Sequence, residues 1–203
     1  TGTMDLTQLT DPKLDLKMAV KQALLFRNDT MSLRADGNLT CTGSLTKADV
    51  AGRVELVRGR VFKEIEFLPL SFPDQLPPRL LNVSTTATPP SAPLVFADWN
   101  LNVDIVTSEP IRLLGNVLNG RAVADLHLSG TGALPVLEGK ISQQGARVKL
   151  PFSRLELTRG DIIFTKDRPF DPQLDLQGDS MVGNTQVTVY ATGSAAKPAL
   201  RFT

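Results

Sequence analysis

The chain has 203 residues, of which 41% are hydrophobic and 21% charged, a composition typical of folded rather than disordered proteins. Its formal net charge is +1 and its basic and acidic residues are interleaved, so we expect no polybasic face that would attract nucleic acid or an anionic membrane surface. No apolar run approaches the roughly 20 residues that span a bilayer, and any signal or anchor is expected to lie outside these residues.

Residues 1–66 alternate apolar and polar side chains, as in strands that bury one face. Between residues 13 and 20 the apolar positions are Leu14, Leu16, Met18 and Val20, and Leu39 and Cys41 continue the pattern further on. The best candidate for a helix, Lys17 to Phe26, fits two short strands equally well. We therefore predict a first set of strand repeats over residues 1–66.

Residues 67–100 differ in composition from the segments on either side. Prolines from Pro69 to Pro93 interrupt them, and a polar run, Ser84 to Thr88, lies among these prolines. Proline removes a donor from the hydrogen-bond ladder of a sheet. We predict a Pro/Ser/Thr-rich loop excursion here, with strands on both sides of it belonging to one continuous structural domain.

Residues 101–203 are predicted to form a second set of strand repeats, separated by turn signals such as Arg159-Gly160-Asp161. About a dozen strands of roughly five to seven residues result for the whole chain. No window carries a clear helical period, so the predicted fold class is all-β. The apolar positions of this set include Leu101, Val103, Ile105, Leu126, Leu128, Leu155, Leu157, Leu174, Leu176, Val187 and Val189.

Short sequences recur at irregular spacing. The run DPKLDL at residues 11–16 returns as DPQLDL at 171–176, and Gly52-Arg53-Val54 is echoed by Gly139-Lys140-Ile141. The run that starts with Thr42-Gly43 is matched by the runs that start with Thr131-Gly132 and Thr192-Gly193. Such recurrence predicts an elongated sheet that grows by adding hairpins, each burying its apolar face beside its neighbours.

The residues offer little for catalysis. His127 is the only histidine and lies on the polar side of a strand without a recognisable motif around it, so we assign it no role. Cys41, the only cysteine, is on the apolar side, where we expect it to fill the core. The aspartates at 167, 171, 175 and 179 match no calcium loop, and Gly130-Thr131-Gly132 matches no phosphate loop. We expect no enzymatic activity, no metal and no cofactor.

Several motifs follow one another in the C-terminal part: GALPVLEGKI at 132–141, LELTRGDIIF at 155–164, and a last element from Val187 to Pro198. Their order resembles the C-terminal domain of TamB, the translocation and assembly module subunit of the AsmA-like, bridge-like lipid-transfer superfamily. The likeness covers residues 99–203 well and 11–62 more loosely. The chain stops before the terminal apolar segment of that family, so it is interpreted as a fragment that lacks the region contacting the outer-membrane partner TamA.

The resemblance implies a periplasmic protein of a Gram-negative bacterium, anchored in the inner membrane by a region outside these residues. It also implies a sheet curled lengthwise into a β-taco-like trough, whose apolar lining carries phospholipid acyl chains, or other apolar cargo, between the two membranes during outer-membrane biogenesis. The residues expected to line this groove are Leu14, Leu16, Met18, Leu101, Val103, Ile105, Leu126, Leu128, Leu155, Leu157, Leu174, Leu176, Val187 and Val189.

Two alternatives stay open at this point. A closed β-sandwich with a filled core would show the same alternation as an open groove. In place of lipid transport, the protein could act in protein secretion, as an assembly factor for outer-membrane or autotransporter β-barrel proteins. An open sheet edge would then pair with the strands of its client by β-augmentation.

Overall fold

The computed structural model describes residues 2–5, 11–27, 31–62, 96–115, 117–149 and 153–203. These residues form twelve strands and no α-helix, which confirms the predicted all-β class and the expected number of strands. The strands are β1 (Gly2–Asp5), β2 (Lys13–Arg27), β3 (Met31–Ser44), β4 (Ala48–Phe62), β5 (Asn100–Thr107), β6 (Ile111–Leu114), β7 (Leu118–Thr131), β8 (Pro135–Lys149), β9 (Arg154–Thr165), β10 (Arg168–Val182), β11 (Thr185–Ser194) and β12 (Lys197–Phe202).

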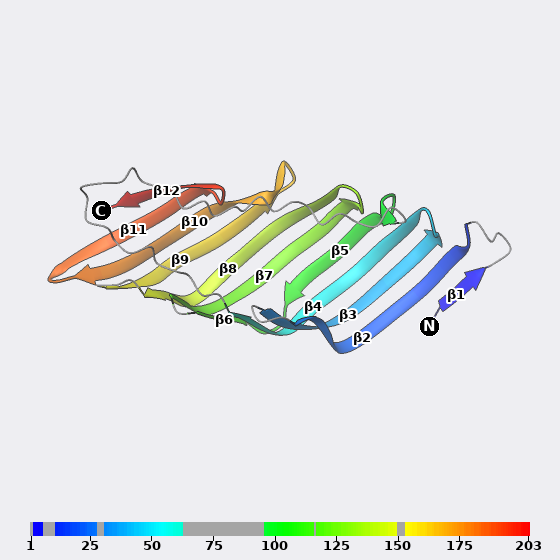
Figure 1. Ribbon diagram of the computed structural model, residues 1–203, viewed down its shortest axis with the longest axis horizontal. Helices are drawn as coiled ribbons and strands as arrows, with labels where there is room; N and C mark the ends of the chain where they lie inside the picture. Colours follow the sequence, from blue (N-terminus) through cyan, green and yellow to red (C-terminus); the bar gives the residue numbers. More distant parts are fainter. Residues whose placement is uncertain (1, 6–10, 28–30, 63–95, 116, 150–152) are drawn as a thin grey trace, which may run out of the picture.

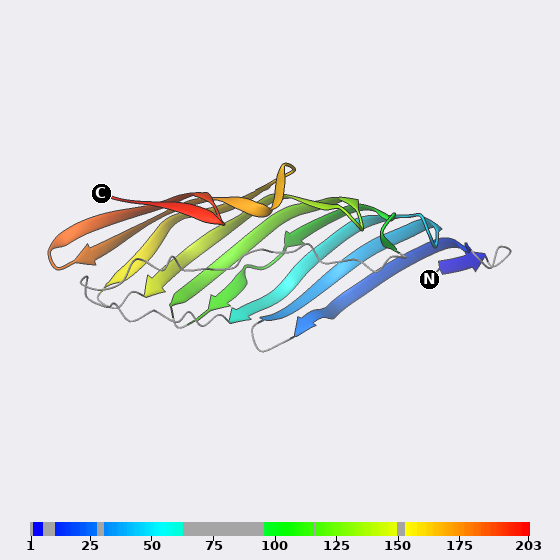
Figure 2. The ribbon, with the colours of Figure 1, turned by 45° about the horizontal axis from the view of Figure 1, so that its top comes forward.

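All the strands belong to one sheet, in the order β1-β2-β3-β4-β5-β7-β8-β9-β10-β11-β12, with β6 between β4 and β7. Neighbouring strands pair antiparallel except at β4, which pairs parallel with both β5 and β6. The strands lie side by side in chain order, from β1 at one end of the molecule to β12 at the other (Figure 1). Figure 2 shows that they form one twisted, curved layer, which agrees with the predicted elongated, curled sheet.

Most strands are longer than the roughly five to seven residues that the sequence pattern predicted. β2, β4, β8 and β10 have 15 residues each. The prediction was wrong because β-bulges shift the alternation within a strand, so that one long strand resembles two short ones. In β2 the register shifts between Val20 and Ala23, beside Gln22, whose φ of 50° lies in the left-handed region. The window Lys17 to Phe26 is therefore part of one bulged strand.

A second bulge replaces the turn predicted at Arg159-Gly160-Asp161. β9 runs through these residues, and its register with β10 shifts at Thr158, between Leu157 and Arg159. Glycine serves here for packing rather than for turning, because the side chain of Gln143 occupies the space that a Cβ at residue 160 would need.

The hairpins β3–β4, β7–β8 and β11–β12 share one turn design. In each, a glycine of positive φ precedes a hydroxyl residue, whose Oγ accepts a hydrogen bond of 3.2 Å from the amide three residues further on. This geometry corrects the alignment of the Thr-Gly repeats, in which Gly132 was set against Gly43 two residues out of register. The equivalent pairs are Gly43-Ser44, Gly130-Thr131 and Gly193-Ser194.

The repeated Asp-Pro runs anchor the strand that precedes two of these hairpins. In both copies the proline carbonyl accepts a hydrogen bond from one turn amide, and the aspartate carboxylate accepts one from the next amide. The bonds are Leu45 N to Pro12 O at 3.0 Å, Thr46 N to Asp11 Oδ1 at 3.0 Å, Ala195 N to Pro172 O at 2.8 Å and Ala196 N to Asp171 Oδ1 at 3.0 Å. β2–β3–β4 and β10–β11–β12 are therefore copies of one three-stranded unit, and β5–β7–β8 is a third copy, in which Trp99 O accepts from Gly132 N at 2.9 Å.

The best-buried apolar cluster lies at the hairpin end of β2, β3 and β4. Leu14, Cys41 and Ala48 are 5%, 3% and 0% exposed, which confirms that Cys41 fills the core. Trp99, just before β5, packs against this cluster and donates a hydrogen bond from Nε1 to Leu45 O at 2.8 Å. The start of the second set of strands thus covers part of the first.

Strands from both predicted sets belong to the same sheet, since β4 pairs with β5 and β6. The Pro/Ser/Thr-rich excursion predicted for residues 67–100 lies outside the described residues up to residue 95. The division of the chain at residues 66 and 100 stays a prediction.

Candidate functional site

Register and alternation together decide which side chains share a face of the sheet, because directly paired residues in neighbouring strands point to the same side. Across β2 to β7, three rows of paired residues contain the predicted groove residues of this half. The rows are Leu16–Cys41–Val50–Leu101, then Met18–Leu39–Gly52–Val103–Leu128, then Val20–Gly37–Val54–Ile105–Leu126. Leu14, two residues before Leu16, lies on the same face.

The C-terminal strands continue this face. Ala124, two residues before Leu126, starts a row that crosses to β10, and further rows follow along β9 to β11. These rows are Ala124–Ile141–Ile162–Leu174, then Gly160–Leu176–Ala191, then Leu157–Gly178–Val189, then Leu155–Ser180–Val187. The structure therefore brings all the predicted groove residues to one side of the sheet, here called the apolar face. Their role in binding a ligand stays a prediction.

The apolar face is only partly shielded from solvent. Leu14 and Val103 are 5% and 7% exposed, Met18 is 48% exposed, and the other predicted groove residues have intermediate exposure. Extensive contacts between described strands are confined to sheet neighbours and to the pair β8 and β10, which flank β9. Within the part of the chain that the structure describes, no second layer of strands or helices packs on this face.

Glycines separate the larger side chains along the apolar face. The side chains of neighbouring strands lean over these glycines, so that a Cβ on Gly59 would lie 2.8 Å from Leu33 Cδ2, and one on Gly178 would lie 2.8 Å from Leu155 Cγ. Small residues relieve crowding where side chains converge, as they do on the inner side of a curved sheet. The repeated Gly52-Arg53-Val54 and Gly139-Lys140-Ile141 place glycines on this face in equivalent strands.

Two polar residues on the apolar face were missed in the sequence. Gln143 bridges a gap between β8 and β9: its Nε2 donates to Leu157 O at 3.0 Å and its Oε1 accepts from Ala146 N at 2.8 Å. Ser180 is 6% exposed, and its Oγ has no hydrogen-bond partner among the described residues. The even spacing of Ser180 from Leu174 and Leu176, and of Gln143 from Ile141, was the available signal. The bulge in β8 beyond Gln144 decides only which groups Gln143 contacts.

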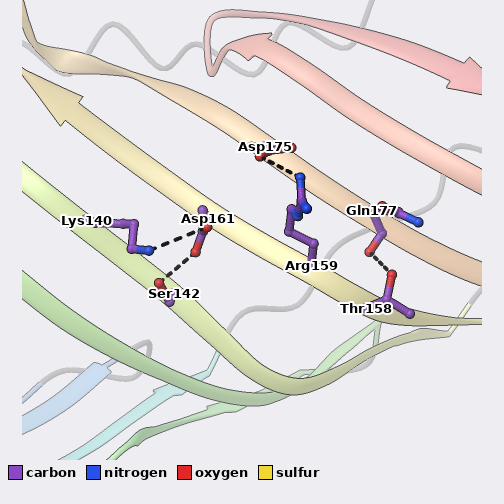
Figure 3. Close-up of polar contacts among 7 residues, drawn as sticks. All are labelled: Lys140, Ser142, Thr158, Arg159, Asp161, Asp175 and Gln177. Carbon is purple, nitrogen blue, oxygen red and sulfur yellow. Dashed lines mark hydrogen bonds and ion pairs between the residues drawn. The ribbon is translucent and has the colours of Figure 1, made fainter.

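The opposite face of the sheet carries ordered polar contacts between neighbouring strands. In Figure 3 the polar side chains of β8, β9 and β10 follow one another along this face. Asp161 accepts a hydrogen bond of 2.7 Å from Ser142 and pairs with Lys140 at 3.6 Å, and Arg159 pairs with Asp175 at 3.4 Å (Figure 3). These contacts agree with the predicted position of Asp175 on a solvated face.

His127 also lies on this polar face, as predicted. Its Nδ1 is 2.8 Å from Asp104 Oδ1, and the two side chains are 40% and 56% exposed. Among the described residues, no group of three or more His, Cys, Asp and Glu side chains could hold a metal ion. Burial raises the pKa of the Cys41 thiol, and the charge of Asp49 raises it further, so this cysteine is held in its neutral, unreactive form.

The polar face does contain a basic patch, contrary to the expectation from the interleaved charges. The register sets arginine opposite arginine in three places: Arg34 and Arg58, Arg60 and Arg112, and Arg112 and Arg121. All five side chains are exposed. The expectation was wrong because interleaving along the chain says nothing about which residues the pairing of β3, β4, β6 and β7 brings together.

A comparison with known families gives one result. A family model described as the TamB C-terminal domain matches residues 1–203. A search of the curated proteins finds no match. None of the described residues forms a helix long and apolar enough to cross a membrane. The family match implies a protein of the Gram-negative cell envelope, with a TamA-like partner and a role in outer-membrane protein assembly or transport. The chain therefore belongs to the TamB family, whose C-terminal domain it matches over its whole length.

Proposed function

We propose that this domain holds phospholipid acyl chains against its apolar face and carries them through the periplasm between the inner and outer membranes. The observation that supports this most directly is the continuity of the apolar rows from β2 to β11. In this proposal no bond is made or broken, so the domain acts without an enzymatic site and without a cofactor.

The energetics favour a continuous track over a single binding site. Exposing an acyl chain to water costs about 0.8 kcal/mol per methylene, so a chain of about 16 carbons needs apolar contacts worth roughly 12 kcal/mol. With roughly 4.8 Å between neighbouring strands, β2 and β11 are about 38 Å apart along the sheet. A lipid tail could then slide from row to row without leaving apolar contact.

The partial exposure of the apolar face is consistent with a groove that admits a mobile ligand. A filled sandwich core would contain large side chains that are almost completely buried. Among the described residues, no large side chain has an exposed fraction below 2%.

The test uses neighbouring residues that point to opposite faces. Leu126→Arg places a charge on the apolar face, whereas Asp125→Arg, one residue away, places the same charge on the polar face. In an open groove the arginine can reach water, so we expect Leu126→Arg to fold and to lose lipid passage, with Asp125→Arg retaining it. Leu176→Arg and Gln177→Arg form a second matched pair.

Passage is measured by crosslinking lipid to photoreactive residues that replace Val103 and Leu128, which pair with each other across β5 and β7. A melting curve for each variant accompanies this measurement. Lipid adducts that disappear only in the apolar-face variants would support the proposal. An absence of adducts in the unaltered chain, combined with unfolding of Leu126→Arg, would instead favour a closed core and remove the transport function.

The second candidate function is assembly of outer-membrane or autotransporter β-barrel proteins by β-augmentation. The family match favours a role of this kind, and β12 has six exposed residues and only β11 as a described neighbour. Pairing along a backbone edge tolerates changes in side chains elsewhere on the polar face. Asp175→Asn should therefore leave client binding intact, whereas Leu200→Pro, which removes a backbone donor on the open side of β12, should weaken it.

A further inference from the structure

The basic patch on the polar face departs from the pairing found elsewhere on that face. In other places the structure joins opposite charges across strands, as in Arg147 with Glu156 at 3.1 Å and Arg159 with Asp175 at 3.4 Å. Around Arg112 the cross-strand neighbours are Arg60 on one side and Arg121 on the other. Like charges directly opposite one another destabilise a sheet, and no described carboxylate forms an ion pair with Arg112 or Arg121.

Arg112, Arg121 and Arg147 line a hollow at the ends of β6, β7 and β8. Its volume is about 450 Å³, and its lining includes Arg112, Arg121, Arg147 and Asn119. Two glycines complete it: a Cβ at Gly120 would lie 2.6 Å from Ala146 Cβ, whereas no atom lies within 4 Å of a Cβ position at Gly145. The hollow is therefore open on the side of Gly145 and positively charged on the side of the arginines.

We propose that this hollow binds a phosphate group, with Arg112, Arg121 and Arg147 as its ligands. A guanidinium offers parallel N–H donors that match the oxygens of phosphate or carboxylate. One arginine can satisfy both oxygens of a carboxylate, whereas phosphate has more acceptor oxygens, arranged tetrahedrally, and can accept from several arginines at once. Glu156, which already accepts from Arg147 Nε, neutralises only one of the three charges. A bound phosphate would also relieve the repulsion between Arg112 and Arg121.

The inference does not depend on the proposed groove, because these arginines lie on the polar face and the groove residues on the apolar face. The phosphate could belong to a lipid headgroup at a membrane surface or to a small soluble phosphate ester. The recognition chemistry is the same for both sources, and the two are separated by experiment.

The experiment measures binding of glycerol 3-phosphate to the 203-residue chain by calorimetry, and of the chain to phosphatidylglycerol-containing vesicles by cosedimentation, with phosphatidylcholine vesicles for comparison. The test variant is Arg112→Gln/Arg121→Gln. The control is Arg34→Gln/Arg58→Gln, which removes the same charge from another like-charged pair of the basic patch, outside the hollow. We expect the test variant to bind glycerol 3-phosphate roughly tenfold more weakly or worse, and the control to change by less than about twofold.

Binding of both probes would identify lipid headgroups as a source, and binding of glycerol 3-phosphate alone would identify a soluble ester. Either result supports the site if the binding is lost in the test variant and kept in the control. The proposal is overturned if the unaltered chain binds neither probe, or if both double variants weaken binding equally, since that describes diffuse surface charge. Melting curves with and without phosphate check folding, and phosphate should raise the Tm of the unaltered chain and of the control but not that of the test variant. Arg121→Lys keeps the charge but loses the planar fork, so it should weaken binding without altering the fold.

Discussion

The units β2–β3–β4 and β10–β11–β12 share the hydrogen bonds that the backbone amides of the hairpin turn donate to the Asp-Pro run but differ in burial. Both begin with an Asp-Pro run, and in both the first leucine pairs with the glycine of the hairpin turn, Leu14 with Gly43 and Leu174 with Gly193. Leu14 is 5% exposed, whereas the equivalent Leu174 has intermediate exposure and Leu200, on the last strand of the second unit, is 62% exposed. Local sequence therefore specifies the hairpin, and the strands beside it decide how much of its apolar side is covered.

The difference in burial between the two units comes from the residues at the start of β5. Trp99 packs on the cluster of Leu14, Cys41 and Ala48, and Phe96 meets its ring edge-on, with ring centroids 4.7 Å apart. β12 has no described strand on its outer side. In a sheet built from repeats, each unit depends on its neighbour for part of its stability.

The largest expected effect comes from truncating leucines of the two units. Leu14→Ala should lower the free energy of unfolding by about 2 to 4 kcal/mol, because it leaves a cavity in a covered cluster. Leu174→Ala should cost about 1 to 2 kcal/mol, because this leucine is less buried. Leu200→Ala should cost less than about 0.5 kcal/mol. Urea denaturation monitored by circular dichroism measures all three, and equal losses would contradict the role assigned to β5.

Glycine substitution tests a second difference between the units. Gly52 of the first unit has a φ of 147°, and a Cβ there would collide with the carbonyl oxygen of Asn38, whereas the equivalent residue of the last unit is Phe202. Gly52→Ala should therefore cost about 2 kcal/mol or more. Gly145→Ala is the control, since its φ is 61° but nothing lies within 4 Å, and it should cost about 1 kcal/mol. Thermal melting of both variants would show whether steric collision or backbone conformation dominates.

Removing the indole N–H donor tests how much Trp99 stabilises the first unit. Trp99→Phe keeps an aromatic ring but loses the hydrogen bond from Nε1 to Leu45 O, which is 2.8 Å long and partly buried. We expect a loss of about 1 to 2 kcal/mol, measured by urea denaturation. Hydrogen exchange should show faster opening of the β3–β4 hairpin and no change in the β11–β12 hairpin. Equal acceleration in both hairpins would mean that the units unfold together.

The smallest effect concerns the aspartate that holds the first turn. Hydrogen bonds from the turn, chiefly from the Thr46 amide, hold the pKa of Asp11 below its ordinary value. Ionised Asp11 therefore contributes stability above the ordinary aspartate pKa of about 3.9, and this contribution is lost as the pH falls through the lowered value. Asp11→Asn should be less stable than the unaltered chain at neutral pH, and their melting temperatures should converge under acid conditions. A difference in melting temperature that persists below the lowered pKa of Asp11 would mean that the effect of the substitution comes from the geometry of the turn rather than from charge.

Much of the candidate site follows from the sequence. Leu101, Val103 and Ile105 lie on the apolar face because their alternation is local and uninterrupted, and the same holds for Leu174 and Leu176. The face of Gln143 follows from its spacing from Ile141, but its hydrogen bonds to Leu157 and Ala146 could not be found, because they depend on a bulge in β8 and on a gap in the pairing with β9. The arginine pairs were hidden for a related reason, since Arg34, Arg58 and Arg121 are separated in sequence and meet only through register.

The sequence by itself determined that the chain forms strands, that each strand has an apolar side, and that one hairpin unit recurs. These properties depend on residues two apart or on short turns, where the backbone geometry is local. The tertiary structure alone decided the lengths of the strands, the bulges that shift their register, the cover over Leu14 and the basic patch around Arg112. These properties depend on which strands lie side by side and in which register. Backbone hydrogen bonds form in the same way whatever the side chains are, so the residues that meet across strands are known only once the register of the whole sheet is set.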